Sequence, residues 1–144
     1  MNIFCDTSVL VAGCVRRHPH FNRAHLIFER AQSGEDDYFI SSHSLAETYA
    51  VLTMLPLQPK IVPAEAKVIL NTNITPLFKR VQATAKLYET AINRCVDLGL
   101  SGGVIYDALL LSCAKSIDAE RIYTFNVRDF QRIMPDVANR ISAP

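Results

Sequence analysis

The sequence predicts an α/β protein, a single three-layer α/β/α domain over residues 1–144 with a central, mostly parallel sheet. Short apolar runs typical of buried strands alternate along the chain with longer segments of helical periodicity. Because right-handed crossovers return the chain to the same edge of a sheet, this alternation favours parallel pairing. A length of 144 residues suits one domain with its own core, and no repeat or low-complexity stretch marks a second one.

The first strand is expected at Ile3–Cys5, which is apolar on both faces. It ends abruptly in three small polar residues, Asp6, Thr7 and Ser8. These residues also form an N-cap signal for a short helix at Val9–Val15. In α/β proteins, ligands bind where the carboxyl end of a strand leads into a helix. Asp6 is therefore placed either to cap this helix or to hold a cation.

A basic segment, residues 16–20, comes next and is either a solvated loop or a phosphate contact. An amphipathic helix is predicted at Phe21–Gln32, and a second strand at Tyr38–Ile40. The helix after that strand is expected from Leu45 to Leu55, with Glu47 in its first turn. Ser44 and Glu47 also match a capping box, in which Glu47 would only bond the first amide of the helix.

The second half of the chain continues the alternation. A proline-punctuated connector leads to a short helix at Ala64–Leu70 and a third strand at Ile74–Val81. Thr84–Leu98 is predicted to be a helix that Gly99 ends. A fourth strand is expected at Arg121–Thr124, followed by a short helix, a terminal turn and an edge strand within residues 133–141.

Val104–Ala114 is predicted to be a helix that is buried on most sides, because it is apolar almost all round. Asp107 is its only charged residue. The helix dipole would favour that charge in the first turn, which is consistent with a capping role. A carboxylate that enters a buried helix nevertheless needs a partner, and a metal ion is one such partner.

Four acids are predicted to converge on one edge of the sheet: Asp6, Glu47, Asp107 and Asp129. Two of them follow strands, and the other two begin helices near the same edge. Such carboxylates repel one another and shift their pKa values unless a cation neutralises them, so the pKa of Asp107 should be raised. Their hard oxygens suit Mg²⁺ or Mn²⁺, which can activate water and neutralise a phosphodiester.

The motifs resemble those of the PIN-domain nucleases, and within that family the small VapC-type toxins of prokaryotic toxin–antitoxin pairs. The motifs are Asp6-Thr7-Ser8, Ser44-Leu45-Ala46-Glu47, Tyr106-Asp107-Ala108 and Thr124 to Phe130, and together they extend over the whole chain. The resemblance implies a PIN-like, Rossmann-like fold. It implies that the four acids are catalytic and bind the metal, with Thr7, Ser8 and Thr124 in support. Asn126 competes with Asp129 for the last metal-facing position.

The family resemblance implies a Mg²⁺-dependent, single-strand-specific endoribonuclease that hydrolyses RNA by metal-activated water, forms a homodimer and is held inactive by a cognate antitoxin. A PIN nuclease of RNA processing or decay, without an antitoxin, is one alternative. A metal-dependent phosphomonoesterase is another, although it would require an Asp at the position of Ser8. A binding module whose acids are only caps is the third. A metal-free ribonuclease that uses His43 as general base is also compatible with the sequence.

The net charge of +1 argues against a strongly basic nucleic-acid clamp but allows a local basic patch. Five residues are candidates for RNA contact: Arg16, Arg17, Lys79, Arg80 and Arg128. Arg128 is favoured because it adjoins the proposed ligands. The absence of a basic leader and of a long apolar run predicts a cytoplasmic protein that is not in a membrane. The four cysteines are expected to be reduced core thiols.

Overall fold

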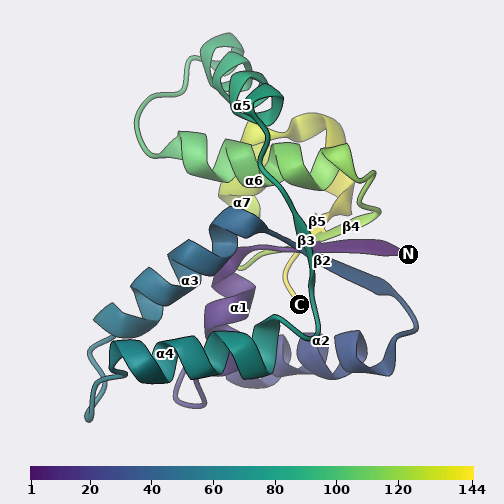
Figure 1. The fold of residues 1–144 in the computed structure, drawn as a ribbon. Helices are drawn as coiled ribbons and strands as arrows, with labels where there is room; N and C mark the ends of the chain where they lie inside the picture. Colours follow the sequence, from purple (N-terminus) through teal and green to yellow (C-terminus); the bar gives the residue numbers. More distant parts are fainter.

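The computed structural model describes residues 1–144 and contains one sheet of five parallel strands in the order β3-β2-β1-β4-β5. The strands are β1 (Asn2–Cys5), β2 (Asp37–Ser41), β3 (Lys79–Val81), β4 (Arg121–Tyr123) and β5 (Ile141–Ser142). In register, Ile3 of the central strand lies beside Tyr38 on one side and Arg121 on the other. Helices cover both faces, so the predicted α/β class is confirmed (Figure 1).

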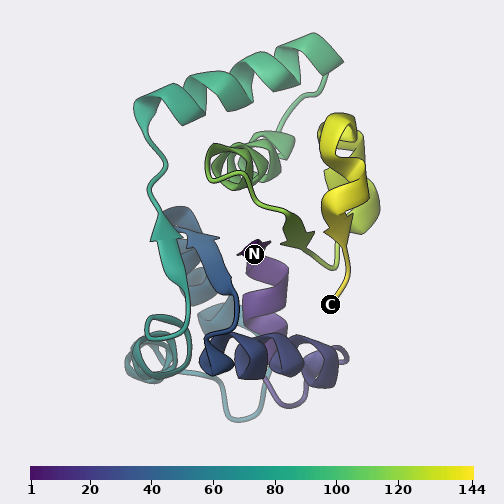
Figure 2. The ribbon, with the colours of Figure 1, turned by 90° about the vertical axis from the view of Figure 1, so that its right-hand side faces the viewer.

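The helices divide into two layers (Figures 1 and 2). One layer contains α1 (Thr7–Cys14), α2 (Phe21–Ser33), α3 (Ser42–Met54) and α4 (Pro63–Ile69). The other contains α5 (Ala85–Leu98), α6 (Val104–Ser116) and α7 (Val127–Ile133). A π-helical turn, Leu70–Ile74, extends α4, and a 3-10 helix, Pro135–Arg140, leads into β5. No helix combines the length and apolarity needed to cross a membrane.

The central strand carries side chains into two separate cores, because successive residues of a strand face opposite sides of the sheet. Phe4 packs in the core formed with α5, α6 and α7, whereas Ile3 and Cys5 pack with α1 and α2. Seven consecutive residues of α6, 108–114, are buried. Strand β1 is apolar on both faces because each face packs in one of these cores, and α6 is apolar all round because most of its surface is buried. All four cysteines are free, as predicted.

Two predicted boundaries are wrong. The third strand is only Lys79–Val81, rather than Ile74–Val81, because the π-helical turn continues the preceding helix and buries Ile74. Helix α3 begins at Ser42 rather than Leu45, directly after the strand. The predicted terminal turn and edge strand are both present, but the strand contains only two residues, 141 and 142.

Helices α1 and α2 approach each other at Gly13. The ring of Phe28 in α2 lies where a side chain at this position would be, since an added Cβ would stand 2.5 Å from its Cε1 atom. Phe28 is itself buried and packs edge-on against Phe78, with ring centroids 5.2 Å apart. Only a residue without a side chain allows this contact.

Candidate active site

Asp6 is the central acid of the site, because β1 is the middle strand and Asp6 follows it directly. Its side chain is buried, and Oδ2 accepts hydrogen bonds from Ser8 Oγ at 2.7 Å and Thr124 Oγ1 at 2.9 Å. The Ser8 amide also donates to Oδ2 at 3.3 Å, so Asp6 is the N-cap of α1. Burial raises the pKa of Asp6, while the hydrogen bonds from Ser8 and Thr124 oppose that shift.

The two hydroxyls that contact Asp6 are held in one direction. Ser8 Oγ accepts a hydrogen bond from the Phe125 amide, and Thr124 Oγ1 accepts one from the Asn126 amide, both at 3.0 Å. Each hydroxyl can therefore direct its only proton at the Asp6 carboxylate. These bonds tie the end of β1 to the end of β4 and orient the Asp6 carboxylate without using a cation.

Glu47 reaches the same edge from α3. Its Oε1 accepts a hydrogen bond from Thr7 Oγ1 at 3.3 Å and lies 3.6 Å from His43 Nε2. The capping-box interpretation is wrong, because Ser41 is the N-cap and Ser44 lies one turn inside the helix. Burial raises the pKa of Glu47 and the charge of Asp6 raises it further, while His43 lowers it.

Asp107 lies in the first turn of α6 but caps nothing, since the N-cap is Gly103 and no side chain bonds the first amides. Burial raises the pKa of Asp107 to about 6. Three further acids add to this shift by repulsion: Asp6, Glu47 and Asp129. The expected elevation is therefore present, and its causes include repulsion of the Asp107 carboxylate by Asp6, Glu47 and Asp129.

Asn126 and Asp129 both lie at the start of α7 and are exposed. Asn126 is the N-cap, yet its side chain makes no capping hydrogen bond. Its backbone amide is bonded to Thr124, whereas the charge of Asp129 acts on Asp107. This electrostatic contact favours Asp129 as the fourth acid of the cluster.

Comparison with known proteins identifies the family. The chain matches the PIN domain over residues 3–134. The chain belongs to the PIN-domain family. Among curated relatives, Ribonuclease VapC27 of Mycobacterium tuberculosis is 32% identical over 116 residues, which span 80% of this chain and 78% of that protein.

Solved structures share the fold of this PIN domain. One is VapC20 of Mycobacterium tuberculosis, a Sarcin-Ricin loop cleaving toxin, with a TM-score of 0.67 at 19% identity, covering 88% of this chain and 92% of that one. VapBC2 from Rickettsia felis, bound to a DNA fragment from its promoter, gives a TM-score of 0.70 at 20% identity, covering 99% and 98%.

The four acids of this PIN domain form no ion pair with a Lys or Arg side chain. The ion pairs of Lys and Arg involve other acids, Asp37 and Asp136, and only His43 approaches one of the four. No three His, Cys, Asp or Glu side chains are arranged to hold a metal ion together. Mg²⁺, however, keeps several waters and binds proteins through one or two carboxylates. The oxygen donors and the unbalanced charge therefore fit a hydrated Mg²⁺ or Mn²⁺.

Of the five basic candidates, only Arg128 adjoins one of the four acids, Asp129, in the sequence. Arg128 is exposed at the start of α7 and forms no ion pair, including with the neighbouring Asp129. Lys79 pairs with Asp37 at 2.7 Å, where β2 and β3 begin, and thus at the opposite end of the strands from Asp6. Arg80 follows it in the short strand β3 and is also exposed.

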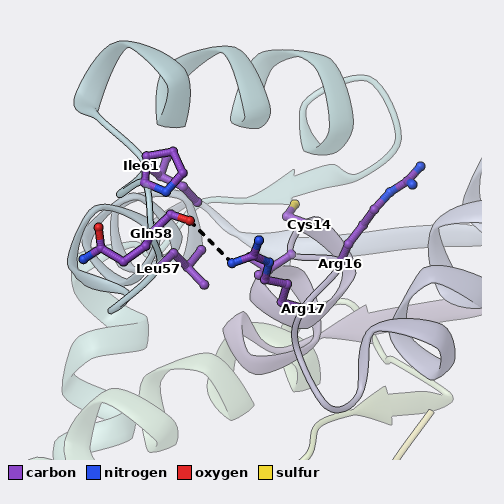
Figure 3. Close-up of a pocket in the computed structure, with 8 residues that line it drawn as sticks. Cys14, Arg16, Arg17, Leu57, Gln58 and Ile61 are labelled. Atoms are coloured by element: carbon purple, nitrogen blue, oxygen red, sulfur yellow. Dashed lines mark hydrogen bonds between the residues drawn. The ribbon is translucent and has the colours of Figure 1, made fainter.

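Arg16 and Arg17 line a separate hollow of about 250 Å³ between the α1–α2 loop and the α3–α4 connector. Figure 3 shows the Arg17 guanidinium turned toward Gln58, whose carbonyl oxygen accepts from Nη1 at 3.5 Å, while Arg16 extends away. None of the four acids lines this hollow.

The sequence did not predict that aromatic side chains border the acids. His43 stacks on Tyr106, and His20 stacks on Phe125. A signal was available, since Tyr106 directly precedes Asp107 and Phe125 directly precedes Asn126. A residue that directly precedes a site residue lies at the same edge of the sheet, so both aromatic side chains could have been expected there.

Proposed function

We propose that this PIN domain is a Mg²⁺-dependent endoribonuclease that acts as the toxin of a toxin–antitoxin pair. The observation that carries the proposal is a set of acids without a Lys or Arg partner, in which burial and repulsion by Asp6, Glu47 and Asp129 raise the pKa of Asp107 to about 6. The relationship to ribonucleases of the VapC group supports RNA as the substrate. VapBC2 from Rickettsia felis supports an antitoxin as the partner.

The side chains of the site have separate tasks in this proposal. Asp6, Glu47, Asp107 and Asp129 supply carboxylate oxygens, of which one or two would contact the hydrated ion directly and the others through its waters. When bound, Mg²⁺ lowers the pKa of a water molecule and neutralises negative charge on the phosphodiester. Ser8 and Thr124 orient the Asp6 carboxylate through their hydroxyl protons.

Thr7 orients the Glu47 carboxylate through its hydroxyl proton, so the acids are positioned before any substrate arrives. Such preorganisation removes the need to rearrange protein dipoles during the reaction.

The chemistry predicts the ends of the products. Attack by water in line with the 3′ oxygen leaves a 5′-phosphate and a 3′-hydroxyl. The test incubates purified protein with a panel of structured RNAs in Mg²⁺, Mn²⁺ or EDTA, beside the Asp6→Asn variant. We expect 5′-phosphate products with either metal and none in EDTA or with the variant. Products with 2′,3′-cyclic phosphate that form in EDTA would instead indicate attack by the 2′-hydroxyl with His43 as base.

The other enzyme class and the binding module fit the structure less well. A phosphomonoesterase would need an acidic nucleophile two residues after Asp6, but Ser8 stands there and its hydroxyl is bonded to Asp6 and Phe125. A module whose acids are caps is not supported, because only Asp6 bonds the amides of a helix start.

A toxin differs from a PIN nuclease of RNA processing in its effect on cells. We expect induced expression of the chain to arrest growth, and co-expression of a neighbouring antitoxin gene to relieve the arrest.

We further propose that the protein forms a homodimer. Exposed apolar side chains on α5, namely Tyr88, Ile92 and Val96, supply a surface for such contacts. Analytical ultracentrifugation tests that assignment, and the proposal of a cytoplasmic location is tested by cell fractionation.

Arg128 is proposed to contact the RNA backbone beside the scissile phosphate. Replacing it with Glu should raise KM roughly tenfold and make KM less dependent on salt, since each phosphate contact releases counterions. Lys86→Glu is a matched control, because Lys86 is also exposed and unpaired but lies on α5. An Arg128→Glu variant whose KM and salt dependence equal those of Lys86→Glu would exclude the contact.

A further inference from the structure

We propose that two aromatic pairs beside the acids are stacking platforms for unpaired RNA bases on either side of the cleaved phosphate. The first, the Tyr106 pair, consists of His43 and Tyr106. The second, the Phe125 pair, consists of His20 and Phe125. This inference rests on the proposed ribonuclease function and names the side chains that would hold the nucleotides on either side of the cleaved phosphate.

The order of the strands places the pairs on opposite sides of Asp6. Asp6 follows β1, which lies between β2 and β4 in the sheet. His43 lies at the start of α3, directly after β2, and Phe125 lies directly after β4. An RNA strand with its scissile phosphate at Asp6 and its backbone along this edge would therefore have one pair on each side.

The Tyr106 pair is parallel, with an angle of 6° between the ring planes and 5.9 Å between the centroids. This is an offset stack of the kind that aromatic rings prefer. The ring of Tyr106 is held by His43, which in turn lies 3.6 Å from the carboxylate of Glu47. Tyr106 nevertheless remains 54% exposed, so it is an oriented ring that the core does not use.

The Phe125 pair is tighter, with centroids 4.4 Å apart and an angle of 11°. Phe125 is linked to the site through its amide, which donates to the Ser8 hydroxyl that bonds Asp6. The guanidinium of Arg23 lies 5.7 Å from the centre of the Phe125 ring. His20 is the exposed member of this stack and is the ring that a base could reach.

Unpaired nucleobases match these rings better than duplex does. Every base presents a flat π-face, and stacking on aromatic side chains binds single strands with little regard to sequence. In a duplex those faces are covered by neighbouring bases. The net charge of +1 also leaves little general attraction for phosphate, so base contacts must supply part of the affinity.

The test compares Tyr106→Leu and His20→Ala with two matched controls. Tyr49→Leu removes a tyrosine that is 39% exposed on α3, and His25→Ala removes an exposed histidine on α2. The substrates are an unstructured twelve-nucleotide RNA that carries 2-aminopurine at successive positions, and a duplex of the same sequence. Cleavage is measured in Mg²⁺, and binding is followed by aminopurine quenching in the Asp107→Asn background.

We expect Tyr106→Leu and His20→Ala each to raise KM for the single strand about tenfold or more, with kcat nearly unchanged. Quenching should be lost at one nucleotide position for each variant, and the two positions should lie on opposite sides of the cleaved bond. Tyr106→Phe should restore the affinity because it restores the ring, and the controls should behave as wild type.

Failure of the inference and failure of the proposed function give different results. Cleavage by Tyr106→Leu and His20→Ala with wild-type KM would overturn the stacking platforms and leave the nuclease intact. Ring-dependent quenching without cleavage in Mg²⁺ or Mn²⁺ would support the platforms and overturn the nuclease. Absence of both binding and cleavage by the wild type would overturn both.

Discussion

Asp107→Asn is expected to abolish RNA cleavage while making the metal-free protein more stable. Asparagine keeps the shape of the side chain but removes a charge that three other acids repel. Because even indirect partners of a metal ligand change activity by about 10–100-fold, loss of a ligand should reduce kcat by at least about a hundredfold. If Asp107 were only a cap, Asn would replace it with little loss.

The stability that Asp107→Asn gains over wild type should be larger at high pH than at low pH. The pKa of Asp107 is about 6 in the folded protein and 3.8 in its ordinary state, so the folded protein binds the proton more tightly. The charged carboxylate therefore destabilises the fold above pH 6, and this penalty disappears as the pH falls toward 4. Because the group is partly solvated, the gain at pH 8 should be about 1–2 kcal/mol.

Thermal unfolding in EDTA at pH 8 and pH 4 measures this difference. Asp107→Asn should melt above wild type at pH 8 and together with it at pH 4. Addition of Mg²⁺ at pH 8 should raise the Tm of the wild type more than that of the variant, since ligands stabilise the state that binds them. Full activity in the variant, or a lower Tm at pH 8, would remove Asp107 from the site.

Gly13→Ala is expected to destabilise the protein even though alanine favours helices. Helix propensity alone would stabilise α1 by about 1 kcal/mol. The new Cβ, however, would lie 2.5 Å from the Phe28 ring, which is buried and braced by Phe78. Overpacking of this kind costs about 1–3 kcal/mol, so the steric effect should win.

Urea denaturation measures the change, with Gly103→Ala as the control. Gly103 has a negative φ, and no heavy atom lies near an added Cβ there. Its substitution should alter the free energy of unfolding by less than about 0.5 kcal/mol. A Gly13→Ala variant that is as stable as this control would show that helices α1 and α2 separate easily at their crossing.

The sequence predicted those parts of the fold whose burial leaves a strong pattern. The apolar run of β1 and the nearly continuous apolar surface of α6 were assigned correctly, because both lie between layers. The third strand was predicted too long, since the apolar side chains of Ile74 and Phe78 suit either a strand or the end of a helix. Local pattern could not distinguish the two.

Topology predicts that the acids lie near one edge of the sheet, but it does not assign their individual roles. A parallel sheet brings strand ends together, and this places Asp6 and Asp129 near one edge whatever the side chains do. The role of Glu47 depended on where α3 begins, and a shift of three residues removed it from the capping position. The far location of Lys79 depended on its pairing with Asp37, which no local spacing reveals.

The hydrogen bond between Thr124 and Asp6 joins residues 118 positions apart in the sequence. A ribosome therefore makes the central strand first and must synthesise most of the chain before β4 can join it. Pairing across such a separation is slow, because a long loop must close before the contact forms. A nascent chain of this design therefore lacks the Thr124 hydroxyl that orients Asp6 for nearly the whole of its synthesis, and its site is assembled only after β4 has been made.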